Sequence, residues 1–503
     1  MVDAPHPHSR LVGQPLLYAS RYSPASFGYD QGVMSGIITG PHFIEYFHEP
    51  SASEIGMMVA VLEIGAFFTS IAAGRVGDII GRKGTLFIGA IVFTIGGAVQ
   101  TFTIGFWSMV IGRVISGCGV GLLSTIVPIY QSEISPPNHR GALACMEFTG
   151  NIIGYSSSVW TDYFCSFINS NLSWRIPLFI QCVIGAILAA GSLVMPESPR
   201  WLIDTDKDEE GMRVIADLHG GDLDNVVAIA EFAEIKEKVQ EERDSGEGRS
   251  YGMMWRKYKR RVLLAMSSQA FAQLRLLYLL VSLARVFEEA GWIGRDAILM
   301  TGINSLIYIL STLPPWYLVD RWGRRAILLS GAVVMGIALV GTGWWLYIDV
   351  PQTAQAVVVY NSWGPLPWLY PPEIMPLTIR AKGVSLSTGN THSTTPVLQE
   401  LIEWRLYPMH GFFCACSFVV VYPETKGVPL EEMDAVFGED EREERLDNES
   451  LASERASLMS NSLPSNHQAI TSSRYRGNRS WFGRLFKRED GGPAYQPVAA
   501  RED

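Results

Sequence analysis

The chain has 503 residues, of which 48% are hydrophobic and only 18% charged, whereas ordinary soluble proteins are about 25% charged. The charges are also segregated, since 28 of the 90 lie in residues 196–261 and 22 in residues 438–503. This pattern favours long apolar spans joined by polar loops and does not suit a soluble enzyme. The net charge of −10 argues against nucleic acid as a partner.

Apolar stretches long enough to cross a bilayer, about 20 residues, recur along the chain. Eight are convincing, at residues 55–73, 84–104, 106–128, 141–165, 176–195, 262–284, 297–318 and 326–348. Three are weaker, at residues 16–40, 354–372 and 409–422. The sequence therefore predicts an all-α membrane protein with about eleven recognisable spans.

Basic residues predict on which side each loop lies. Arg75 and Arg82 follow the second span, and residues 256–261 are rich in Arg and Lys, whereas residues 41–52 contain neither. Because Lys and Arg concentrate in cytoplasmic loops, we expect both termini and the loop 196–261 in the cytoplasm.

Charged motifs recur between the two halves of the chain. A Gly-Asp-x-x-Gly-Arg motif recurs in a shorter form 242 residues later, so that Asp78 corresponds to Asp320. Glu133 and Arg140 recur 240 residues later as Glu373 and Arg380. The charges concerned are Asp78, Arg82, Glu133, Arg140, Glu197 and Arg200 in the first half, and Asp320, Arg324, Glu373 and Arg380 in the second. Repeats of this length predict two homologous halves of about six helices.

Five regions follow from the repeat and the charge distribution. They are an N-terminal cytoplasmic tail (1–15), a first membrane bundle (16–195), a cytoplasmic helical linker (196–261), a second membrane bundle (262–437) and a disordered cytoplasmic tail (438–503).

The repeated charges are candidates for a cytoplasmic gate. Charges at helix ends can pair between neighbouring helices when the inner side is closed, and separating them lets the halves rock apart. Charges that only set topology are the alternative. Placement in both halves favours the gate.

Two charged residues lie within the early spans. Asp30 is in the first, and Arg113 is the one basic residue of the fourth. An ionised carboxylate is costly there and usually faces a cavity or a partner, so a gated contact between Asp30 and Arg113 is a candidate proton-loading site. A turn or capping role for Asp30 is the alternative.

Small residues at intervals of four favour close helix packing. They are Gly28, Gly32 and Gly36 in the first span, and Gly117 and Gly121 in the fourth.

Polar side chains of the second half suit a polyhydroxylated ligand. Gln269 and Gln273 share one helical face, and each amide offers donors and an acceptor. Trp368, in a Pro-rich stretch, has a ring that can stack on a sugar. Interhelical amide bonds and an interfacial Trp are the alternatives.

Together these motifs resemble the sugar porter family of the major facilitator superfamily, most closely fungal hexose and related monosaccharide transporters. The resemblance covers about residues 25–438 and rests on an ordered set of motifs: Gly28-Tyr-Asp-Gln-Gly32, Gly77-Asp-x-x-Gly-Arg-Lys83, Pro128-Ile-Tyr-Gln-Ser-Glu133, Pro196-Glu-Ser-Pro-Arg-Trp-Leu202, Asp320-Arg-Trp-Gly-Arg-Arg325 and Pro423-Glu-Thr-Lys-Gly427.

The resemblance implies the major facilitator fold, with two pseudo-symmetric six-helix bundles, a central sugar site and alternating access. It implies proton coupling through Asp30 and Arg113. It matches Gln273 and Trp368 to sugar-binding positions, and Asn390 to an eleventh-span Asn. The expected partners are a monosaccharide, protons and the lipid bilayer, with no cofactor and no metal.

The chain also departs from the family pattern. Arg275-Leu-Leu replaces an expected Gly-x-Asn after Gln273, Ala272 replaces a glutamine, and Glu147-Phe148 replaces another. Residues 384–408 are too polar to span a bilayer alone, so the eleventh helix is expected to be missing or truncated.

The leading hypothesis is proton-coupled import of a hexose-like monosaccharide across the plasma membrane. A non-transporting sugar sensor that signals through residues 438–503 is the second hypothesis. An inactive or mis-assembled relative of a sugar transporter is the third. No nucleotide loop, metal cluster or nucleophile motif supports an enzyme.

Overall fold

The computed structural model describes residues 28–135, 140–244, 251–268 and 294–323, and in addition the single positions 326, 330, 374, 375, 380, 382 and 384. The chain divides into Met1–Glu441, which contains all of these, and Arg442–Asp503. The regular structure of the described residues is helical throughout. The division of the membrane region into bundles 16–195 and 262–437 stays a prediction.

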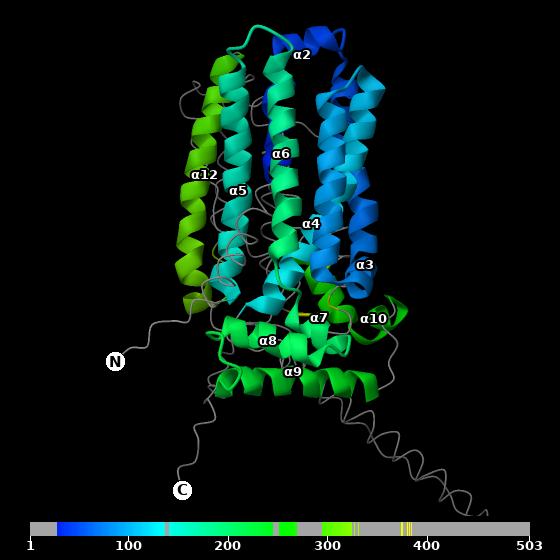
Figure 1. The fold of residues 1–503 in the computed structure, drawn as a ribbon. Coiled ribbons are helices and arrows are strands. Elements are labelled where there is room, and N and C mark those ends of the chain that lie inside the picture. The colour runs from blue at the N-terminus through cyan, green and yellow to red at the C-terminus, as the bar shows by residue number, and fades with distance from the viewer. Residues whose placement is uncertain are drawn as a thin grey trace, which may run out of the picture. The chain divides into compact units, whose positions relative to one another are not determined.

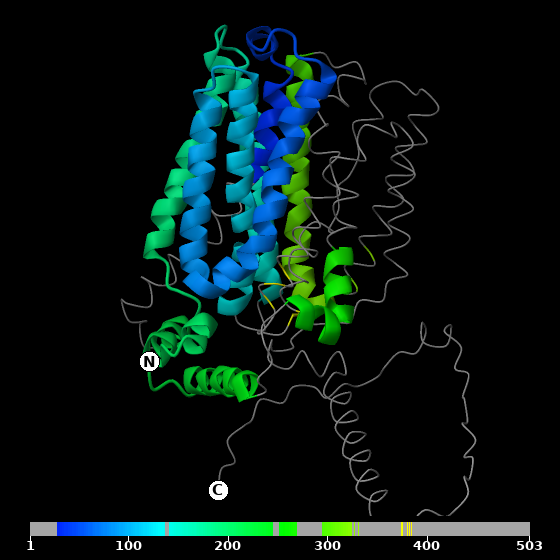
Figure 2. The same cartoon turned by 90° about the vertical axis from the view of Figure 1, so that its right-hand side faces the viewer.

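Five long helices run side by side, with α2 at one end of them and α7 to α10 at the other (Figures 1 and 2). Residues 28–37 form a helix, here named the first-span helix. The long helices are α3 (Ala52–Thr101), α4 (Phe106–Ile134), α5 (Arg140–Cys165), α6 (Leu172–Val194) and α12 (Arg295–Trp322). The shorter helices are α2 (Pro41–Tyr46), α7 (Pro199–Asp204), α8 (Asp208–Leu218), α9 (Val226–Asp244) and α10 (Tyr251–Lys257).

Four of the described helices are long and apolar enough to cross a membrane, namely Ser53–Thr101, Phe106–Ile134, Leu172–Val194 and Arg295–Val319. These four helices cover nearly all residues of five predicted spans, namely 55–73, 84–104, 106–128, 176–195 and 297–318. Helix α5 matches the predicted span 141–165, and its 26 residues extend about 39 Å. The predicted spans 262–284, 326–348, 354–372 and 409–422, and the first part of 16–40, lie wholly or largely outside the described residues.

Helix α3 contains two predicted spans, 55–73 and 84–104, joined at Gly81. Its 50 residues would extend about 75 Å if straight, far more than a bilayer core of about 30 Å. Gly81 breaks the helix with φ 86° and ψ 171°, and a Cβ there would lie 2.3 Å from Glu197 Oε2. Contacts with α4 run in opposite directions along the two arms, so the chain reverses at Gly81.

Helix α4 packs closely against the first arm of α3 through glycines. A Cβ on Gly117 would lie 2.1 Å from Leu62 O, and one on Gly121 would lie 2.3 Å from Ala66 O. Only glycine permits this approach of two backbones. The close packing predicted for Gly117 and Gly121 is confirmed.

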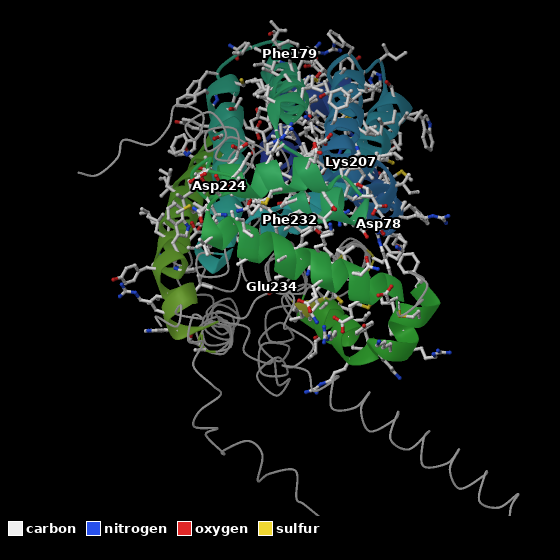
Figure 3. All side chains as sticks on the ribbon, turned by 60° about the horizontal axis from the view of Figure 1, so that its bottom comes forward. Asp78, Phe179, Lys207, Asp224, Phe232 and Glu234 are labelled. Atoms are coloured by element: carbon white, nitrogen blue, oxygen red, sulfur yellow. The ribbon has the colours of Figure 1, made fainter. Side chains whose placement is uncertain are left out.

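Helices α7 to α10 occupy most of residues 196–261, and α7, α8 and α9 pack around a small apolar core. That core contains Ile203, Ile215, Ala228, Ile235 and Val239. Charged side chains cover the outside, as in the ion pair of Arg243 with Asp206 at 2.7 Å. Figure 3 shows α8 and α9 running alongside each other, with Lys207 and Asp224 at the two ends of α8.

Candidate functional site

Six charged side chains gather at the end of the long helices where α7 to α9 lie. They are Asp78 and Arg82 of α3, Glu133 of α4, Glu197 before α7, and Arg380 and Lys382 from the second half, here named the linker-side cluster. The sequence repeat predicts that charged residues of both halves lie together at the cytoplasmic ends of the helices. The cluster contains Asp78, Arg82, Glu133, Glu197 and Arg380 of the predicted gate, and Arg200 contacts it through the backbone oxygen of Glu133.

Arg82 and Glu133 form the centre of the linker-side cluster. Arg82 Nε and Nη2 donate to the two carboxylate oxygens of Glu133, each at 3.0 Å, and Nη1 donates to Gly77 O at 3.0 Å. Ser198 Oγ also donates to Glu133 Oε2 at 2.6 Å. The side chains of Arg82 and Glu133 are only 4% and 0% exposed. A bidentate pair with further donors fixes both side chains in one geometry.

Two side chains of the second half reach across to carboxylates of the first. Lys382 Nζ donates to Asp78 Oδ2 at 2.7 Å, and Arg380 Nη1 lies 3.8 Å from Glu133 Oε1. Arg380 and Lys382 are 1% and 6% exposed. These two contacts are ones that must break if the halves separate at this end.

Glu197 binds the start of the second arm of α3. Its carboxylate accepts from the backbone N–H groups of Arg82 at 2.9 Å and Lys83 at 3.1 Å, directly after the break at Gly81. An anion at a helix N-terminus is electrostatically favourable. Burial raises the pKa of the Glu197 carboxyl, although these donors oppose the shift.

The sequence motifs group Asp78 with Arg82, Glu133 with Arg140 and Glu197 with Arg200, and the contacts of the described side chains differ from this grouping. Asp78 and Arg82 do approach, at 3.7 Å, but Arg82 makes its bidentate contact with Glu133. Arg200 donates to the backbone oxygen of Glu133 at 3.2 Å. The reversal at Gly81 explains this, because it brings the start of the second arm to the end of α4. Lys382 was not among the predicted gate residues.

Asp30 and Arg113 meet inside the helices, and are here named the interior pair. Arg113 Nη1 donates to Asp30 Oδ1 at 3.2 Å, and Arg113 Nε donates to Met58 O at 3.2 Å. Asp30 is 0% and Arg113 3% exposed. Glu63, which is 9% exposed, interacts electrostatically with both members. The first-span helix, α3 and α4 thus meet at one buried ionic site.

Gln181 of α6 is also part of this site, although no sequence motif points to it. Its Nε2 donates to Asp30 Oδ1 at 2.8 Å and to Ser116 Oγ at 3.1 Å. Arg113 and Gln181 thus converge on one oxygen of Asp30, and Asp30 Oδ2 has no hydrogen bond. The free oxygen is a position at which the carboxylate can accept a proton.

Several predicted site residues lie outside the described part of the chain. They are Gln269, Gln273, Trp368 and Asn390 of the predicted sugar site, and Arg324 and Glu373 of the predicted gate. Arg140 and Asp320 are described in their backbone only. The predicted loss of the eleventh helix, at residues 384–408, falls almost entirely on residues that are not described.

The model of a protein family described as "Sugar (and other) transporter" matches residues 17–437. The chain belongs to this family. It is 33% identical over 428 residues to the MFS-type transporter criB of Aspergillus cristatus, covering 82% of this chain and 90% of criB. It is 30% identical over 475 residues to the sugar transporter STL1 of Saccharomyces cerevisiae, covering 86% of this chain and 83% of STL1.

The fold is also similar to a solved structure of this family. The structure of the proton:xylose symporter XylE of E. coli bound to 6-bromo-6-deoxy-D-glucose matches with a TM-score of 0.76 and 25% identity. The match covers 85% of this chain and 99% of the XylE chain. The predicted family and the predicted all-α major facilitator fold are confirmed, and the chain is a multi-pass membrane protein.

Proposed function

We propose that this protein moves a monosaccharide across a membrane by alternating access, coupled to protons. The observation that carries the proposal is the interior pair, a buried carboxylate and guanidinium from the first and fourth spans with one free carboxylate oxygen. The names of similar proteins support the substrate class, since they include a sugar transporter, a high-affinity glucose transporter of Kluyveromyces lactis and a proton:xylose symporter.

The interior pair supplies the coupling step. While Asp30 is ionised, Arg113 and Gln181 hold its Oδ1, and the first-span helix is fixed to α4 and α6. A proton that binds at Oδ2 neutralises the carboxylate and weakens its attraction to Arg113. The first-span helix is then released to move with the bound sugar. Loss of the proton on the other side restores the pair.

The linker-side cluster supplies the gate. Arg82 and Glu133 belong to the same half and stay together. Arg380 and Lys382 belong to the other half, so their contacts with Glu133 and Asp78 form when this end closes and break when it opens. Arg140, Asp320, Arg324 and Glu373, whose side chains are not described, remain part of the same proposal.

The proposed location is the plasma membrane, with both termini and residues 196–261 in the cytoplasm. Two features support this orientation. The basic Arg75 and Arg82 flank the reversal of α3 at Gly81, where Arg82 N–H donates to Glu197 of the linker, and α8 and α9 lie across that end of the long helices (Figure 1). Basic residues at one end of the spans mark the cytoplasmic side.

The test is transport by the full-length chain in lipid vesicles, with radiolabelled hexoses and pentoses offered one at a time. We expect stereoselective exchange of at least one sugar, and accumulation of that sugar when the outside is made acidic. Exchange without accumulation would refute proton coupling. Sugar binding without exchange would refute transport and favour a sensor.

A further inference from the structure

A second buried carboxyl group lies close to the first-span helix. Asp162, three residues before the end of α5, is 4% exposed. Neither carboxyl oxygen has a hydrogen-bond partner. The Gly36 N–H lies near enough to act as a weak donor to the carboxyl group, but it does not reach the distance and angle of a hydrogen bond. An ionised carboxylate with no partner is costly inside a membrane protein.

Asp162 is packed directly against the backbone of the first-span helix. A Cβ on Gly36 would lie 2.5 Å from Asp162 Oδ2, and a Cβ on Gly32 would lie 2.0 Å from Ser158 Oγ. Gly28 approaches α5 in the same way. The close packing predicted for these glycines is confirmed. The contact at Gly36 leaves no space for water or a counter-ion between the helix and the carboxyl group.

Asp162 and the interior pair lie on different faces of one helix. Asp30 and Gly36 are six residues apart, which places them about 120° apart around the axis at 100° per residue. Asp30 faces α4 and α6, whereas Gly36 faces α5. A displacement of the first-span helix therefore changes the surroundings of both Asp30 and Asp162.

The titratable groups around Asp162 carry no positive charge. They are Tyr29 on the first-span helix, and Tyr155 and Cys165 on α5. All three are neutral or negative in any protonation state. None can stabilise an ionised Asp162 as a counter-ion.

Basic side chains on the neighbouring helices are engaged elsewhere. Arg175 of α6 stacks on Trp174 at 4.7 Å, and Arg295 of α12 stacks on Phe167 at 4.8 Å. Within the described ranges, no basic side chain forms an ion pair with Asp162. Among the groups that the described residues offer, none balances a negative charge on Asp162, and a proton would do so.

We propose that Asp162 is a second proton-binding site, which holds its proton as a neutral carboxylic acid while Gly36 packs on α5. When the first-span helix moves away, water reaches the carboxyl group, and the proton passes to that water. The chemistry of the site is that of a simple acid, with no covalent or redox step. The inference does not depend on which sugar is carried.

Infrared spectroscopy of the full-length chain in lipid at neutral pH tests the proposal without transport. The isosteric variant Asp162→Asn is compared with Asp224→Asn, an exposed carboxylate of the linker. Protonated carboxylic acids give a C=O stretching band that shifts in heavy water. We expect this band to lose the contribution of one carboxyl group in Asp162→Asn. Asp224→Asn is expected to lose only carboxylate bands.

Loss of carboxylate bands in Asp162→Asn would overturn the proposal, because Asp162 would then be ionised. Failure of Asp162→Asn to fold, while Asp162→Glu folds, would overturn it equally, since a neutral side chain of the same shape would not replace the native group. Neither result would bear on whether the protein exchanges sugar or on whether Asp30 couples that exchange to protons.

A second measurement follows uptake against pH. Asp162→Asn cannot lose a proton, so we expect the ratio of uptake at alkaline pH to uptake at acidic pH to be several-fold higher than in the wild type. An unchanged ratio would mean that proton release from Asp162 has no part in the cycle, against the proposal.

Discussion

The buried pairs Arg82–Glu133 and Arg113–Asp30 differ in how many hydrogen bonds the carboxylate accepts. Glu133 accepts from Arg82 with both oxygens and from Ser198 as well. Asp30 accepts from Arg113 with one oxygen, at 3.2 Å, and its other oxygen accepts nothing. Both oxygens of Glu133 therefore accept hydrogen bonds, whereas only one oxygen of Asp30 does.

This difference has a chemical consequence. A proton that binds to Glu133 meets donors on both oxygens and two buried arginines beside them, whereas a proton that binds to Asp30 finds an oxygen with no donor. Protonation is therefore opposed at the first pair and permitted at the second. We infer that the linker-side pair holds the fold together and that the interior pair takes part in the transport cycle.

The largest effect is expected from Arg82→Ala. It leaves Glu133 buried and without its bidentate partner, and removal of one member of a buried pair costs about 3–5 kcal/mol. We expect a strong fall in the thermal unfolding temperature of the purified protein and little folded protein in the membrane. The measurement is thermal unfolding in detergent, followed by tryptophan fluorescence.

Arg213→Ala is the matched control for this variant. Arg213 lies 3.9 Å from Glu209 on α8, and both side chains are exposed, by 69% and 93%. Exposed pairs contribute little, so its unfolding temperature should stay that of the wild type. Equal stability of the two variants would contradict a holding role for Arg82.

The next largest effect is expected from Asp30→Asn. Asparagine keeps the shape of the side chain but cannot bind and release a proton, so accumulation against a gradient should be lost while exchange of sugar continues. The measurement is uptake into vesicles with and without an imposed proton gradient. Asp224→Asn is the control, and it should accumulate normally. Persisting accumulation in Asp30→Asn would place coupling elsewhere.

Gln181→Leu sharpens the account of the interior pair. It removes the shorter of the two hydrogen bonds to Asp30, and a hydrogen bond to a charged group contributes about 1.5–3 kcal/mol. The ionised carboxylate is then less stable, so release of its proton should slow. We expect kcat to fall by about tenfold, which is a barrier change of 1.36 kcal/mol, with accumulation retained.

Gln240→Leu, at an exposed position of α9, is the control for an amide lost elsewhere. Its kcat should match that of the wild type. If Gln181→Leu also keeps its kcat, the amide only fills space beside Asp30 and has no positioning role.

Features that the sequence encodes locally could be predicted. The spans of α3 to α6 and α12 follow from length and apolar composition, and the helix break at Gly81 falls between two predicted spans. The motif positions placed Asp30 and Arg113 in the first and fourth spans, and the structure brings them to 3.2 Å. Their roles remain proposals.

Features that depend on packing could not be predicted. Gln181 is a single neutral amide in an apolar helix, and its contact with Asp30 spans 151 residues of sequence. Lys382 reaches Asp78 across 304 residues. Neither has a periodic pattern of its own, because helix packing alone decides which side chains meet.

The smallest effect is expected from Lys382→Met, which tests whether the linker-side cluster also acts as a gate. The pair with Asp78 is partly exposed, since the Asp78 side chain is 22% accessible, so its contribution is about 0.2–1 kcal/mol. Stability should therefore change little. The equilibrium between the conformations closed and open at the linker side should shift toward the open one. A cysteine introduced at this end should therefore be labelled faster.

A double-mutant cycle with Asp78→Asn isolates the pair, because the two single changes should each speed labelling and the double change should add nothing further. Additive effects would mean that Lys382 and Asp78 act separately, and among the described side chains the contact between the halves would then rest on Arg380 and Glu133.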